Sequence, residues 1–99
     1  MITVTKKGDL IEIQGHSHAD ICAAFSTTMY VAVNILSEYD LSCIEFKDLK
    51  ESILPIDKVQ IKILKHDKMI DTIINVMMAS FEDIHRENDS ESKIIIDRG

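Results

Sequence analysis

The sequence predicts an α+β fold, a two-layer sandwich in which two helices pack on one face of a largely antiparallel sheet, in the order ββαββαβ. Short segments near both ends and in the middle of the chain alternate apolar and polar residues, which is typical of strands. Two longer segments, 20–37 and 67–84, repeat apolar residues at helical spacing. The 99 residues have room for one hydrophobic core, so we expect a single domain over 1–99.

The first two strands form a predicted hairpin. Residues 2–6 and 11–14 both alternate isoleucine or valine with polar side chains. Lys7-Gly8-Asp9 lies between them and supplies turn residues. We expect the second strand to end at Gly15.

The first helix is expected from Asp20, as its N-cap, to about Ser37. Its apolar stripe is so wide that little polar face remains, which predicts a mostly buried helix. Ile44 and Phe46 then suggest a short third strand.

A loop over 48–55 follows, and we expect its Ile53 and Leu54 to tuck under the body of the fold. Residues 59–63 alternate cleanly and predict a half-buried strand. Asp67 is the expected N-cap of the second helix, whose apolar residues line one face. A charged turn over 88–92 leads to a last strand over 93–97, whose isoleucine triplet suits a strand buried on both sides.

Composition narrows the functional class. The formal charge is −6, and lysines alternate with acids, so no basic stripe is present to neutralise phosphates and we expect no nucleic-acid partner. We expect no apolar stretch to reach the roughly 18 residues of a membrane span, and the N-terminal residues lack a signal-peptide pattern. We therefore expect a cytoplasmic protein with no membrane partner, in which Cys22 and Cys43 are free thiols.

Two histidines and a cysteine gather where the first long helix is expected to begin. With Asp20 as N-cap, Cys22 occupies the second helical position, where unsatisfied backbone N–H groups and the helix dipole favour a thiolate. His16 lies in the preceding loop, from which a ring nitrogen could reach the sulfur, as in a Cys-His dyad. His18 is a rival for the role of base.

Two other interpretations compete with a dyad. A cysteine in an alanine-rich helix is often an inert, buried small hydrophobe. His16, His18 and Cys22 could instead supply three metal ligands, although HxHxxxC is no standard zinc signature, so we expect no metal and no cofactor. His66 and His85 are expected to be surface residues flanking the second helix.

One region resembles a known family. Gly15-His16, the segment Asp20-Ile21-Cys22-Ala23-Ala24 and then Ser26, after an N-terminal Met-Ile-x-Val hairpin, are similar to the bacterial ribosomal-processing cysteine proteases called Prp. The resemblance implies that His16 is the catalytic base and Cys22 the nucleophile, with Asp20 and Ser26 as supporting residues.

It also implies the task and the assembly. Such a protease removes the N-terminal extension of a large-subunit ribosomal protein, the twenty-seventh in the usual series, by cutting after an aromatic residue, and acts as a homodimer. The extension is then the peptide substrate.

The sequence departs from this family in two places. Cys22 follows His16 by six residues, where the family has a longer, glycine-containing loop, and Asp20 stands two rather than three residues before the cysteine. These departures motivate an alternative function: a catalytically impaired, dimeric, Prp-like protein that binds a ribosomal or peptide partner without cutting it.

Overall fold

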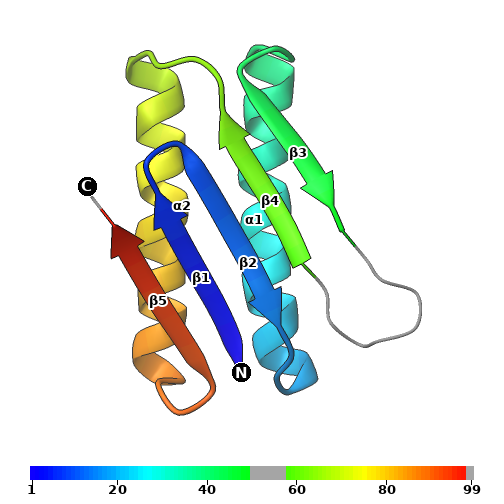
Figure 1. Cartoon of the computed structure of the whole chain (residues 1–99), viewed down its shortest axis with the longest axis vertical. Helices are drawn as coiled ribbons and strands as arrows, with labels where there is room; N and C mark the ends of the chain where they lie inside the picture. The colour runs from blue at the N-terminus through cyan, green and yellow to red at the C-terminus, as the bar shows by residue number, and fades with distance from the viewer. Residues whose placement is uncertain (50–57, 98–99) are drawn as a thin grey trace.

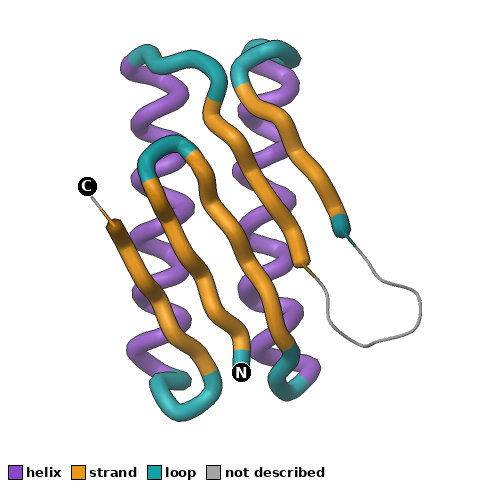
Figure 2. Tube along the Cα trace, in the orientation of Figure 1, coloured by secondary structure: helices purple, strands orange, loops and turns teal. Residues whose placement is uncertain are grey.

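Two helices cover one face of a five-stranded sheet in the computed structural model, which describes residues 1–49 and 58–97 (Figures 1 and 2). The elements are β1 Ile2–Lys7, β2 Leu10–Gly15, α1 Ala19–Tyr39, β3 Ile44–Asp48, β4 Lys58–Ile63, α2 Lys68–Glu87 and β5 Ser92–Asp97. The predicted α+β class and the order ββαββαβ are confirmed. The expected positions of Ile53 and Leu54 lie outside the described residues.

The strands are arranged in the order β3-β4-β2-β1-β5. The pairs β1–β2, β2–β4 and β3–β4 are antiparallel, whereas β1–β5 is parallel, so the sheet is mixed but largely antiparallel, as expected. Figure 1 shows α2 behind the β1–β5 side of the sheet and α1 behind the β2–β4–β3 side. The far face of the sheet has no helix over it among the described elements.

The prediction that the last strand is buried on both sides was wrong. Ile95 is 41% exposed because it points to the sheet face opposite the two helices, and Ile96, on the other side of the strand, is 39% exposed at the edge of the sheet. Its first residue, Ser92, is by contrast almost completely buried.

The hairpin turn follows the sequence signal. Gly8 has φ +58°, a left-handed conformation that glycine adopts without steric cost, at the first position of the two-residue loop between β1 and β2. The register then pairs Val4 with Ile13 and Lys6 with Ile11.

Helix α1 differs from the mostly buried helix that was expected. Its inward stripe is buried, but Tyr30, Val31, Ile35 and Tyr39 are between 40% and 53% exposed on the other side. By length and a mean hydropathy of 1.4, α1 is long and apolar enough to cross a bilayer, contrary to the expectation that no apolar stretch reaches that length. The buried stripe of α1 belongs to the hydrophobic core, and the core helix of a globular protein can be as apolar as a membrane-spanning one.

The core lies between the sheet and the two helices. Phe25 of α1 and Phe81 of α2 meet there with ring centroids 5.5 Å apart. The predicted N-cap of α2 is confirmed, since the Ile70 N–H donates to the Asp67 carboxylate at 2.8 Å. Completely or almost completely buried side chains include Val4, Ile11, Phe25, Leu36, Cys43, Ile61, Ile70, Met77 and Phe81.

Candidate active site

The junction between β2 and α1 is fixed by a glycine. Gly15 has φ +109°, and a Cβ built on it would lie 2.0 Å from the carbonyl oxygen of Met1. No other residue type fits this close approach of two backbones. The next residue is tied to the same place, because the Met1 nitrogen donates to the carbonyl oxygen of His16. The backbone that carries His16 is therefore held against the start of β1.

Helix α1 begins two residues earlier than expected. Its first residue is Ala19 and its N-cap is His18, with no side-chain capping hydrogen bond, so the prediction of Asp20 as N-cap was wrong. Cys22 is consequently the fourth helical residue, and its N–H already donates to the His18 carbonyl at 3.0 Å. The backbone N–H groups of residues 19–21, which precede Cys22 in the first turn of α1, have no partner inside the helix.

The Cys22 thiol is hydrogen-bonded to one residue of the strand-to-helix loop. The Ser17 N–H donates to Cys22 Sγ at 3.3 Å, and the thiol lies 3.4 Å from the Ser17 carbonyl oxygen, to which it can donate. Sequence reasoning gave Ser17 no role. Its only signal was its place in the short loop between His16 and Cys22.

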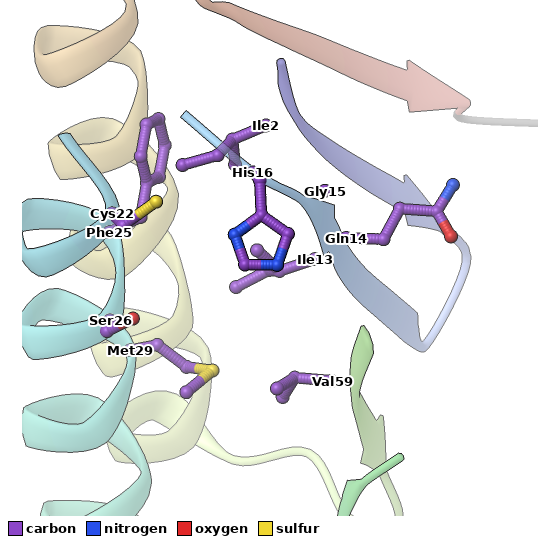
Figure 3. A pocket seen from close by; sticks show the side chains of 10 residues that line it. All are labelled: Ile2, Ile13, Gln14, Gly15, His16, Cys22, Phe25, Ser26, Met29 and Val59. Atoms are coloured by element: carbon purple, nitrogen blue, oxygen red, sulfur yellow. The ribbon is translucent and has the colours of Figure 1, made fainter. Parts of the chain in front are cut away.

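His16 and Cys22 line one open cavity of about 140 Å³. Figure 3 shows the His16 imidazole pointing into the space between β2 and α1, with the Cys22 sulfur on the helix side of that space. Ser26 lies one helical turn beyond Cys22 on the same wall. The rest of the lining is mostly apolar, including Ile2, Ile13, Phe25, Met29 and Val59. The cavity can therefore receive an apolar group beside a thiol and an imidazole.

The other predicted site residues lie outside this cavity. Asp20 is exposed in the first turn of α1, where a carboxylate is favoured by the helix dipole. His18 is exposed at the N-cap. Within residues 1–49 and 58–97, no group of three or more histidine, cysteine, aspartate or glutamate side chains is arranged to hold a metal, so His16, His18 and Cys22 do not form a ligand set.

The two cysteines have different surroundings. Both are free thiols, as expected. Cys43 is completely buried beneath α1, its thiol donates to the Leu36 carbonyl oxygen at 3.6 Å, and burial raises the pKa of that thiol. Cys22 is half-buried and faces the cavity. A thiolate nucleophile must be both ionisable and accessible, and only Cys22 of the two meets the second condition.

Several solved structures are similar to this chain, whereas comparisons of its sequence found no match. No protein-family model and no curated protein matches the sequence. The ribosomal processing protease Prp from S. aureus, solved with a covalently linked product peptide, is 19% identical, with a TM-score of 0.76 over 98% of this chain and all of that chain. The same protease with a substrate peptide is 12% identical, with a TM-score of 0.67 over 97% of each chain.

A third match is SMU.848 from Streptococcus mutans, which is 14% identical with a TM-score of 0.73 and covers 97% of this chain and 93% of its own. The structural likeness thus spans nearly the whole of every chain compared. The resemblance first seen in residues 15–26 is confirmed at the level of the fold: this chain has the fold of the ribosomal processing protease Prp.

Proposed function

We propose that this protein is a cysteine endopeptidase that removes the N-terminal extension of a large-subunit ribosomal protein. The observation that carries the proposal is that His16 and Cys22 line the same cavity at the start of α1. The S. aureus protease was solved with a covalently linked product peptide and with a substrate peptide, which supports a peptide as the substrate here.

In the proposed reaction the imidazole of His16 accepts the proton of the Cys22 thiol, and the thiolate attacks the carbonyl carbon of the scissile peptide bond. The oxyanion that forms is stabilised by backbone N–H groups of the first turn of α1, which have no side-chain cap. The imidazolium then protonates the leaving amine. Water hydrolyses the acyl-enzyme, with His16 again as the base.

Asp20 and Ser26 have supporting roles in this proposal. Ser26 lies on the cavity wall one turn after Cys22, where its hydroxyl can contact a bound peptide. Asp20 stabilises the N-terminal end of α1 through the helix dipole.

The partners and location follow from the same proposal. The net charge of −6 disfavours nucleic acid as a partner, and two unpaired thiols suit a reducing cytoplasm. The proposed assembly is a homodimer, for which the exposed apolar residues of α1 provide a surface.

One observation favours a second candidate, a dimeric Prp-like protein that binds a peptide without cutting it. In the structure the Cys22 thiol forms its hydrogen bonds with the Ser17 backbone. In this second candidate the cavity holds a peptide side chain, but the sulfur never attacks the peptide bond.

The deciding experiment is cleavage of a peptide that spans the junction between the extension and the mature ribosomal protein. Cys22→Ala and Cys22→Ser should abolish cleavage while the protein stays folded. Cys43→Ser is the matched control, because that thiol is buried away from the cavity. Peptide binding without cleavage by the wild-type protein supports the second candidate, and undiminished cleavage by Cys22→Ala rules out the first.

A further inference from the structure

Ser17 connects the Cys22 sulfur to a residue far away in the sequence. Its backbone holds the thiol from one side, while its hydroxyl donates to Glu91 Oε2 at 3.1 Å. Glu91 is 74 residues further along the chain, in the turn between α2 and β5. Both contacts of Ser17 are partly buried.

The turn that carries Glu91 is itself well anchored. The Glu91 carbonyl oxygen accepts a hydrogen bond from the Ile2 N–H at 3.0 Å, and its N–H donates to the Asn88 carbonyl at 3.0 Å. The next residue, Ser92, is 2% exposed, and its hydroxyl donates to the Asn88 carbonyl and lies 2.7 Å from His85 Nδ1. The Glu91 carboxylate therefore projects from a fixed support that joins the end of α2 to β1.

The two contacts of the Ser17 backbone act differently on the two forms of the sulfur. A thiol is only a weak donor, so its hydrogen bond to the Ser17 carbonyl favours the protonated form slightly. A thiolate accepts a charge-assisted hydrogen bond from the Ser17 N–H, which is the stronger interaction. Keeping this N–H against the sulfur therefore favours ionisation.

We propose that Glu91 is a positioning residue for the nucleophile: by holding the Ser17 hydroxyl, it keeps the Ser17 N–H on the Cys22 sulfur as the thiol ionises. The inference rests on the proposed function in that it concerns the same cysteine. Glu91 contacts the loop and not the reacting atoms, so its positioning effect passes through Ser17.

The charged groups around the sulfur determine which variants are informative. The ionisable groups on the cavity and on the loop beside it include His16, Asp20 in the first turn of α1, Glu91 behind Ser17 and the Met1 ammonium, which donates to the His16 carbonyl oxygen. Glu91→Ala removes a hydrogen-bond acceptor and also a negative charge that disfavours a nearby thiolate. Glu91→Gln removes only the charge, and Ser17→Ala removes only the hydrogen bond.

The test is the rate at which iodoacetamide alkylates Cys22, measured from about pH 5 to pH 9, with the modified cysteine identified by mass spectrometry. Ser17→Ala should alkylate about tenfold more slowly at pH 7, with its pH profile displaced to higher pH, because a hydrogen bond to a charged group has this order of effect. Ser17→Thr, which keeps a hydroxyl, should restore the rate. Cys43 is the internal control for folding, since it is completely buried and should not react.

If Cys43 reacts in Ser17→Ala, that variant is not properly folded, and a second pair of variants tests the role of Glu91 instead. Glu91→Gln should alkylate at the wild-type rate or faster, and Glu91→Ala more slowly than Glu91→Gln. Asp89→Ala, an exposed acid in the same turn, should leave the rate unchanged. Equal rates for Glu91→Gln and Glu91→Ala would overturn the proposal, as would an unchanged pH profile in folded Ser17→Ala.

Alkylation requires no peptide substrate, so the two proposals fail separately. A protein that cuts no peptide, but whose Cys22 reactivity depends on Ser17 and Glu91, overturns the peptidase and leaves the positioning role in place. If the protein cuts its peptide, but the reactivity of Cys22 is independent of Ser17 and Glu91, the positioning role is overturned and the peptidase stands.

Discussion

The imidazole of His66 and the carboxylate of Asp71 lie 2.7 Å apart through Nδ1, and the opposite ring nitrogen of His66 lies 2.9 Å from Asp9. A neutral imidazole has one N–H, so only the imidazolium can donate to both carboxylates. The hydrogen bond with Asp71, followed by that with Asp9, raises the pKa of His66 above its usual 6.5. His66 thereby joins the β1–β2 turn to the first turn of α2, at the end of the sheet opposite to the candidate active site (Figure 1).

We predict that His66 stabilises the protein only on the acid side of its folded pKa. A group whose pKa is raised by folding contributes its full stabilisation below the unfolded value, near 6.5, and loses it as the pH rises through the higher folded value. Urea unfolding of wild type and His66→Gln should therefore differ most near pH 5.5 and least near pH 9. The difference should be modest, since the groups are exposed. A difference that grows with pH would contradict the prediction.

Gly15 should tolerate no side chain, whereas Gly8 should tolerate one at a moderate cost. Gly8→Ala forces a left-handed residue into open space and should destabilise the protein by about 1 kcal/mol. Gly15→Ala adds a contact of 2.0 Å with the Met1 carbonyl oxygen, so β1 and β2 must separate locally and the loss should exceed about 3 kcal/mol. Urea unfolding of the two variants makes this comparison directly. Equal losses would show that the close approach at Gly15 is not a constraint.

Local patterns predicted the elements well because each strand and helix has one face in the core. Asp67 could be identified as an N-cap because this contact is local: its side chain accepts a hydrogen bond from the N–H of Ile70, three residues away. Asp20 looked equally suitable, but the helix starts at Ala19. The loop before α1 is held by the Gly15 turn and its contact with Met1, which no local pattern contains.

Features that depend on distant pairing were missed. Ile95 is exposed because it points to the sheet face opposite the two helices, and the strand order also leaves β5 at an edge. The Ser17–Glu91 hydrogen bond and the His66–Asp9 contact each join residues more than 50 positions apart. The sequence could indicate that His16 and Cys22 are near each other, because only a short loop separates them, but not that the thiol is held by the loop backbone.

The outward face of α1 should hold two copies of the chain together. Val31 and Ile35 are 53% and 44% exposed and lie four residues apart on this face. Ile35→Lys should convert a dimer to a monomer, because the charge would be buried without a partner in the interface. Sedimentation velocity is the measurement, with Ile95→Lys on the far face of the sheet as the control. A dimer that survives Ile35→Lys but not Ile95→Lys would place the interface elsewhere.

His16 and His18 can be separated as candidates for the base. The structure places His16 on the cavity with Cys22, whereas His18 is at the N-cap and outside the cavity lining. His16→Ala should therefore lower kcat/KM for the junction peptide by 10²- to 10⁴-fold, on the order expected for loss of a general base. His18→Ala, the matched control, should stay within about threefold of wild type, because it contributes no side-chain cap to α1.

The pH dependence adds a second criterion for the base. The pH profile of kcat/KM should change in His16→Ala and keep its wild-type form in His18→Ala. If kcat/KM of His16→Ala rises continuously to high pH, hydroxide has replaced the imidazole as the base. If His18→Ala abolishes cleavage while His16→Ala retains it, the catalytic imidazole comes from the helix cap, and the loop between 15 and 19 must rearrange when the peptide binds.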